Sequence, residues 1–90
     1  MQVIIKSTHF KASNQLEEFT HKKVERLENL NGKIIRAHVT LSLEPSSEPE
    51  NKTCEIVLSI PGEDPYLKKS ASSFEEAVSL ATDAMHTNTK

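Results

Sequence analysis

Ninety residues with a formal net charge of −2 and a pI near 6.1 predict one small domain with a modest core. This balance excludes the uniformly basic surface of many nucleic-acid binders, so contact with a polyanion requires a local basic patch. The single cysteine, Cys54, excludes an internal disulfide and a multi-cysteine zinc site. The four histidines lack the spacing of metal ligands, so we expect neither a metal nor a cofactor.

The amino-terminal residues predict a strand, because Val3 and Ile5 alternate with Gln2, Ile4 and Lys6. The apolar run that ends at Lys6 is too short for a signal peptide or a membrane-spanning helix. We therefore expect a protein of a reducing compartment, the cytoplasm.

Residues 16–30, LEEFTHKKVERLENL, predict an amphipathic helix. Ser13 or Asn14 caps it, and Asn14 with Glu17 resembles a capping box. Gly32 can take the left-handed conformation that ends a helix. Five residues form the apolar stripe: Leu16, Phe19, Val24, Leu27 and Leu30.

The charges of this helix are sorted by sign. Lys22 and Arg26, spaced i,i+4, lie along one edge of the stripe, with Lys23 beside them. The opposite flank carries the acidic residues and a histidine: Glu17, His21, Glu25 and Glu28. A protein of net negative charge therefore still has a basic edge.

Two alternating runs follow and predict strands. The first places one set of residues on one face: Ile35, Ala37, Val39, Leu41 and Leu43. The second does the same with Cys54, Ile56, Leu58 and Ile60. Residues 44–52, EPSSEPENK, carry two prolines and no large apolar residue, which predicts a long exposed connection between the two strands.

The carboxy-terminal part begins with a turn over residues 61–65. A fourth strand is expected over residues 66–71, but its irregular pattern does not assign faces to Lys68 and Lys69. Ser73 then opens a helix with a Ser-x-x-Glu capping box to Glu76. Its buried stripe is Phe74, Ala77, Val78, Ala81 and Met85, and the tail from His86 to Lys90 is expected to fray.

The order β-α-β-β-β-α predicts an α+β fold. Each strand is apolar on one side, and each helix is apolar along one stripe. An antiparallel or mixed four-stranded sheet with both helices packed on one face, and the other face open, buries these apolar sides. A right-handed crossover through the first helix would make the first two strands parallel.

Three segments carry a resemblance to a known family over Met1 to about Met85. They are the first helix with Leu16, Phe19, Lys23, Arg26, Leu27 and Glu28, the run IIRAHVTLSLE, and the helix start SSFEEAVSLATDAM. In order and spacing they resemble the short form of the ribosome hibernation-promoting factor family, also called ribosome-associated inhibitor, ribosomal subunit interface protein or sigma-54 modulation protein.

The resemblance implies a fold similar to a double-stranded-RNA-binding domain. It implies that residues 1–90 form a single ribosome-binding domain, without the carboxy-terminal dimerisation domain of long-form members. It further implies a monomer that binds the small ribosomal subunit and its rRNA at the subunit interface, over the tRNA and mRNA paths, and silences translation when growth stops. The implied function requires no catalysis, small-molecule substrate or membrane.

The resemblance also points to RNA-contacting residues. Lys23 and Arg26 fall where the family's first-helix pattern has basic residues, and Lys22 lies on the same edge. Further cations would extend this patch if the sheet ends lie near the helix: Lys33, Arg36, Lys68 and Lys69. Taken without the resemblance, Lys22, Lys23 and Arg26 also fit an ordinary solvated helix edge.

Two departures from the family pattern keep an alternative open. Ser73-Phe74-Glu75 stands where many members have an Asp-hydrophobic-Tyr sequence, and residues 84–90 lack the several Lys and Arg that usually continue the second helix. Fewer cations lower RNA affinity and its salt dependence. The alternative is a diverged member that binds a protein through the open sheet face or the 44–52 connection. An enzyme is disfavoured, because the sequence lacks a nucleophile with a base, a metal constellation and a glycine-rich phosphate loop.

Overall fold

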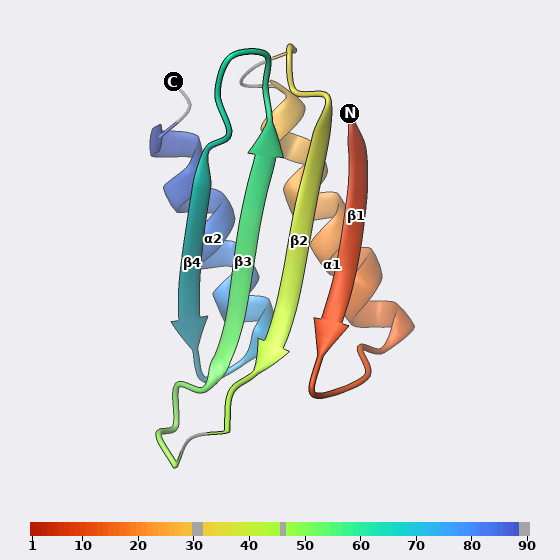
Figure 1. The fold of residues 1–90 in the computed structure, drawn as a ribbon. Coiled ribbons are helices and arrows are strands. Elements are labelled where there is room, and N and C mark those ends of the chain that lie inside the picture. Colours follow the sequence, from red (N-terminus) through yellow and green to blue (C-terminus); the bar gives the residue numbers. More distant parts are fainter. Residues whose placement is uncertain (30–31, 46, 89–90) are drawn as a thin grey trace.

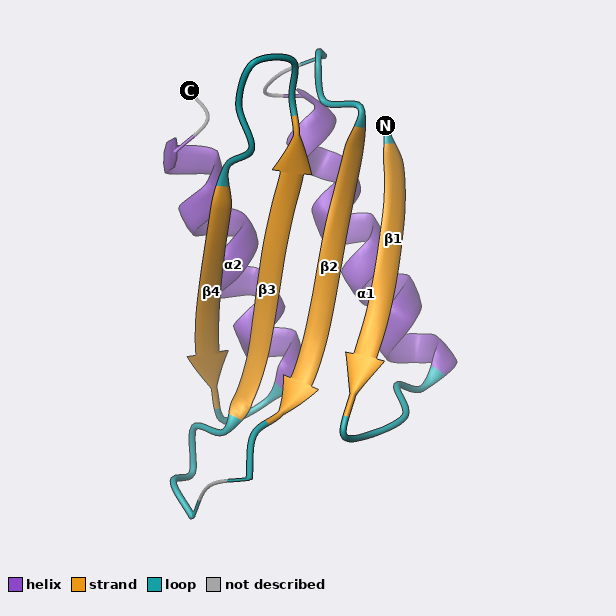
Figure 2. Ribbon diagram, viewed as in Figure 1, coloured by secondary structure: helices purple, strands orange, loops and turns teal. Residues whose placement is uncertain are grey.

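Four strands form one sheet, and two helices cover one of its faces (Figures 1 and 2). The computed structural model describes residues 1–29, 32–45 and 47–88. In chain order the elements are β1 (Gln2–Thr8), α1 (Asn14–Glu25), the 3₁₀ turn η1 (Arg26–Asn29), β2 (Arg36–Leu43), β3 (Lys52–Ser59), β4 (Tyr66–Ala71) and α2 (Phe74–Asn88). The predicted β-α-β-β-β-α fold is confirmed.

The sheet is mixed and runs in the order β1-β2-β3-β4. β1 pairs with β2 in parallel, as the crossover through α1 predicted, while β2–β3 and β3–β4 are antiparallel. Paired residues share a face, so one row across the helix-covered side consists of Ile5, Val39, Ile56 and Leu67.

The hydrophobic core lies between this side of the sheet and the helices. Of the predicted inward-facing residues, Ala37, Val39 and Leu41 of β2 and Cys54, Ile56 and Leu58 of β3 are buried, whereas Leu43 is half-buried. The buried six pack in one cluster with Val24, Leu27, Val78 and Met85 from the helix side. Outside this cluster, the rings of Phe10 and Phe74 stack with centroids 4.2 Å apart. That stack joins the connection after β1 to the beginning of α2.

The ends of α1 differ in part from the prediction. Ser13 is the cap, because its hydroxyl accepts from the Leu16 N–H at 3.1 Å, and Asn14 is already helical, so the Asn14 capping box is wrong. The α-helix ends at Glu25, and the tighter winding of η1 follows with Leu27 fully buried. Leu30 and Asn31 lie outside the described residues.

One helix-end prediction and one strand prediction need correction. Among the described glycines, the left-handed conformation occurs at Gly62, with φ 89°, and not at Gly32. Gly62 lies in the turn before β4, where Ile60 and Glu63 form a bridge. Ile35 precedes β2 and is 55% exposed, because the sheet alternation begins one residue later, at Arg36.

The second helix begins as predicted and runs further than predicted. The Glu76 N–H donates to Ser73 Oγ at 3.2 Å, while the Glu76 carboxylate accepts from Ser72 Oγ at 3.3 Å. The expected fraying from His86 is wrong for the described residues, since α2 continues to Asn88 and Met85 anchors its last turns in the core. Among the described residues, neither helix is long and apolar enough to cross a membrane.

Candidate nucleic-acid interface

The three basic residues predicted on the first helix do lie together, on α1 and η1. Lys22 Nζ is 3.3 Å from Glu18 Oε1, and Lys23 Nζ lies 5.9 Å from the centroid of the Phe19 ring. Lys22 and Arg26 are exposed, whereas Lys23 is half-buried. An exposed i,i+4 pair such as Lys22 with Glu18 is weak, but it places a carboxylate on the predicted basic edge.

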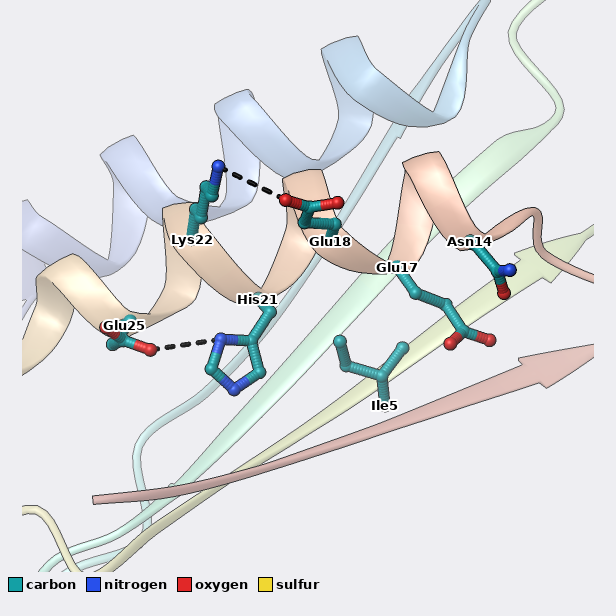
Figure 3. A pocket seen from close by; sticks show the side chains of 7 residues that line it. All are labelled: Ile5, Asn14, Glu17, Glu18, His21, Lys22 and Glu25. Carbon is teal, nitrogen blue, oxygen red and sulfur yellow. Dashed lines mark ion pairs between the residues drawn. The ribbon is translucent and has the colours of Figure 1, made fainter.

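An open groove of about 510 Å³ runs between α1 and β1 (Figure 3). In this view Glu17 and His21 lie on the side of α1 that faces Ile5, Glu25 points to His21, and the paired Glu18 and Lys22 lie along the upper edge of the helix. His21 Nδ1 is 3.0 Å from Glu25 Oε2. The lining residues are Ile5, Asn14, Glu17, Glu18, His21, Lys22 and Glu25. Three carboxylates against one lysine disfavour a phosphate group in this groove.

The whole helix layer, defined here as α1, η1 and α2, has an excess of acid. Its described side chains include three cations, Lys22, Lys23 and Arg26. Against them stand seven carboxylates: Glu17, Glu18, Glu25, Glu28, Glu75, Glu76 and Asp83. Glu28 is paired with the amino-terminal ammonium group. The basic edge of α1 is therefore local and narrow.

The other predicted cations lie on different surfaces. Lys33 is exposed between η1 and β2. Arg36 begins β2 on the uncovered side of the sheet, where its Nε donates to Gln2 Oε1 at 3.4 Å. Lys68 lies on the same side with Nζ 3.5 Å from Glu44 Oε1, whereas Lys69 is in register with the buried Cys54 and belongs to the helix-covered side. Arg36 and Lys68 therefore do not extend the edge of α1.

The uncovered side of the sheet, called here the open face, is mostly polar. It comprises Gln2, Ile4, Lys6, Thr8, Arg36, His38, Thr40, Ser42, Thr53, Glu55, Val57, Ser59, Tyr66, Lys68 and Ser70. Lys6 was missed as a candidate, although its alternation with Ile5 already placed it opposite the core. The sequence pattern does not show that Lys6 shares a cross-strand row with Lys68 of β4 and a face with Arg36 of β2.

A side-chain hydrogen bond joins β3 and β4 on the open face. The Tyr66 hydroxyl donates to Glu55 Oε2 at 2.9 Å. This hydrogen bond raises the pKa of the Tyr66 phenol above its ordinary value, with further contributions from desolvation and from the charge of Glu55. Glu55 is thus already engaged within the face.

The described residues offer little for catalysis. Cys54 is fully buried, and burial, with a contribution from the Glu55 charge, raises the pKa of its thiol from 9.0 to about 12. Such a thiol stays protonated and is a poor nucleophile. Within the described ranges, no group of three or more His, Cys, Asp or Glu side chains is arranged to hold a metal ion.

Comparisons with known proteins agree with the fold. A ribosomal subunit interface protein from Coxiella burnetii matches with a TM-score of 0.86 and 18% identity over 99% of this chain and 93% of that one. The Protein Y N-terminal domain from Thermus thermophilus matches with a TM-score of 0.84 and 21% identity over 100% and 97%. No curated protein sequence matches. The sequence model of the Sigma 54 modulation protein / S30EA ribosomal protein family matches residues 3–89. The chain belongs to this family.

Proposed function

We propose that this protein is a ribosome-binding factor that occupies the subunit interface of the small ribosomal subunit, over the tRNA and mRNA paths. It silences translation in stress or stationary phase by blocking these paths as a cytoplasmic monomer, one copy per ribosome and without turnover. The observation that carries the proposal is the family match over residues 3–89, nearly the full chain.

The charges of the structure support contact with RNA through a few local cations. Lys and Arg attract phosphates through charge and counterion release, and structured RNA is recognised through its shape and backbone. The proposed contact residues are Lys22, Lys23, Arg26, Lys33, Arg36, Lys68 and Lys69. Their division between two sides of the molecule suits a protein lodged in a channel, which RNA surrounds on more than one side.

The test is cosedimentation of the purified protein with vacant ribosomes and with isolated small subunits across a salt series. We expect saturable binding near one copy per small subunit, and binding that weakens steadily as salt rises. The triple variant Lys22→Glu, Lys23→Glu, Arg26→Glu should bind less tightly than the Lys11→Glu control. Lys11 is exposed in the connection after β1. If the triple variant binds as tightly as the wild type, Lys22, Lys23 and Arg26 do not contribute to ribosome binding.

Absence of binding to ribosomes and small subunits even at low salt would overturn the proposal. The remaining candidate would then be a protein-binding regulatory module. Its favouring observation is the acid excess of the helix layer, which repels phosphates and suits a partner protein with basic side chains.

A further inference from the structure

We infer that the open face is a second RNA-contacting surface, which receives the phosphate and 2′-hydroxyl backbone of helical RNA with Lys6, Arg36 and Lys68 as its cations. The inference deepens the proposed function and rests on it. It assigns a role to Lys6 and to a side of the sheet that faces away from the basic edge of α1.

Charge distinguishes the two sides of the molecule. The open face carries three cations, Lys6, Arg36 and Lys68, and one carboxylate, Glu55, among its described side chains. Glu44, at its rim, pairs with Lys68. The helix layer has seven carboxylates for its three cations. In a chain of net charge −2, the positive potential is therefore concentrated over the sheet.

Two cations of the open face, Lys6 and Arg36, are available to a ligand, whereas Lys68 would exchange its ion pair with Glu44 for one with the ligand. Lys6 is exposed and forms no ion pair with the described residues. Arg36 is held by the hydrogen bond from its Nε to Gln2, and the further donors of a guanidinium are on its terminal nitrogens. Arg36 is thus positioned by one contact and still equipped to bind a phosphate oxygen.

The spacing of these cations suits a nucleic-acid backbone rather than a single small anion. Lys6 and Lys68 belong to one row across four strands, so their backbones are roughly 14 Å apart at the usual strand spacing. Arg36 lies four residues along β2 from Thr40, the partner of Lys6, which is roughly 13 Å. Side chains so far apart reach separate phosphates when they extend away from the sheet.

A row of hydroxyl groups borders the row of Lys6 and Lys68, on the side away from Arg36. Thr8, Ser42, Thr53 and Ser70 form a row across all four strands. Thr53 is buried and its hydroxyl donates to the Ser42 carbonyl at 3.1 Å, so Thr8, Ser42 and Ser70 are the members of this row that reach the surface. The minor groove of an RNA helix is wide and shallow and displays 2′-hydroxyls. A hydroxyl-rich sheet face with cations near its margins is complementary to it.

A protein partner fits this face less well. Its apolar side chains are confined to one row, in which Ile4 is 37% exposed, Val57 is half-buried and Tyr66 is 56% exposed. His38 interrupts this row, and the charged row with Lys6, Glu55 and Lys68 borders it. The central part of a typical protein interface is more apolar and is depleted of charge.

The experiment compares the replacement of lysine by glutamate at two positions: Lys6, which lies in β1 on the open face, and Lys11, which lies in the connection after β1. Binding of Lys6→Glu, Lys11→Glu and the double variant Lys6→Glu, Arg36→Glu is measured across a salt series. The probes are vacant small subunits and an RNA duplex of about 16 base pairs. Lys6→Glu and Lys11→Glu make the same change in net charge at two exposed positions. A neutral double variant, Lys6→Gln, Arg36→Gln, and far-UV circular dichroism control for misfolding.

We expect Lys6→Glu to weaken binding and to lower the slope of log affinity against log salt by about 1, and the double variant to lower it by about 2. Lys11→Glu should keep the wild-type slope. Tyr66, the single tyrosine of a chain without tryptophan, lies on the open face, and its fluorescence should change on duplex binding.

The outcomes separate this inference from the proposed function. If the double variant binds small subunits as tightly as the wild type, the open face is not an RNA-contacting surface, and the proposed function is unaffected. Duplex binding that depends on Lys6, without any binding to small subunits, would support the face and overturn the proposed function. Binding to neither probe would overturn both. A specific protein complex lost on Ile4→Asp but unaffected by Lys6→Glu would assign the face to a protein.

Discussion

Thr20 of α1 and Thr82 of α2 are both buried polar residues of the helix layer, but their hydroxyls differ in hydrogen bonding. Thr82 Oγ1 bonds to the carbonyls of Val78 and Ser79, at 3.0 and 3.1 Å. Thr20 Oγ1 has no hydrogen-bond partner within the described part of the chain. A buried hydroxyl without a partner loses its hydration and gains nothing in exchange.

Replacing Thr20 by valine should therefore stabilise the protein. The change keeps the shape of the side chain and removes the unsatisfied hydroxyl, so we expect the free energy of unfolding to rise by about 1 kcal/mol. Thr82→Val is the matched control and should lower it by about 1 kcal/mol, because the hydrogen bond that the hydroxyl shares between the two helix carbonyls is lost. Urea unfolding followed by circular dichroism measures both. Equal effects of the two substitutions would contradict this account.

Cys54 should be unreactive in the folded protein. With a pKa near 12, almost none of its thiol is ionised at about pH 8, so thiol reagents should modify it only after unfolding. Because the folded pKa lies above the unfolded value of 9.0, the folded state binds this proton more tightly. The resulting stabilisation is complete below pH 9 and is lost as the pH rises from 9 toward 12.

The Cys54→Ala variant isolates this effect from other groups that titrate at high pH. We expect the difference in unfolding free energy between wild type and Cys54→Ala to be constant below pH 9 and to shrink above it. A difference that does not change with pH would show that the thiol titrates alike in both states.

Adjacent residues of β3 should differ sharply in their contribution to stability. Ile56 is fully buried on the helix-covered side, whereas Val57 is half-buried on the open face. Ile56→Ala should cost 2 to 5 kcal/mol, roughly the range for a large core side chain, and Val57→Ala about 1 kcal/mol or less. Thermal or urea unfolding of the two variants is sufficient. A cost for Val57→Ala as large as for Ile56→Ala would contradict the register of β3.

The Tyr66 phenol should titrate above its ordinary pKa of 10.0, because its hydrogen bond to Glu55 favours the protonated form. Ultraviolet absorbance follows this titration without interference, since the chain has one tyrosine and no tryptophan. Glu55→Gln should move the midpoint back toward 10.0, and Glu63→Gln should not. An unchanged midpoint in Glu55→Gln would remove this hydrogen bond from the folded protein in solution.

Alternation and capping made most of the fold predictable. The strand over residues 66–71 has the predicted bounds, and Ser73 caps α2 as its Ser-x-x-Glu pattern indicated. The burial of Leu27 was predicted from the apolar stripe, but the change from α-helix to a 3₁₀ turn at Arg26 was not, because it depends on how Leu27 packs within the core. Local pattern also failed at Ile35, whose apolar side chain stays exposed just outside β2.

The candidate interface was less predictable than the fold. Lys22, Lys23 and Arg26 share one helix, so their spacing alone places them together. Lys68 and Lys69 are neighbours in a strand whose exposed positions carry little periodic signal, and which of the two lies on the helix-covered side follows only from pairing with β3. Lys6 and Lys68 lie in one row because β1 and β4 are joined through two intervening strands, which is information that no local window contains.

The parallel pairing of β1 with β2 also bears on the order in which the molecule assembles. β2, β3 and β4 follow one another in the chain, so their antiparallel pairs close over comparatively short connections. β1 reaches β2 only after the chain from His9 to Ile35 has wound into α1 and η1 and returned. Closing this longer connection costs more chain entropy, and β1 has a neighbour on one side alone. We therefore expect β1 to join the sheet last during folding, and its amide protons to exchange with solvent before those of β3.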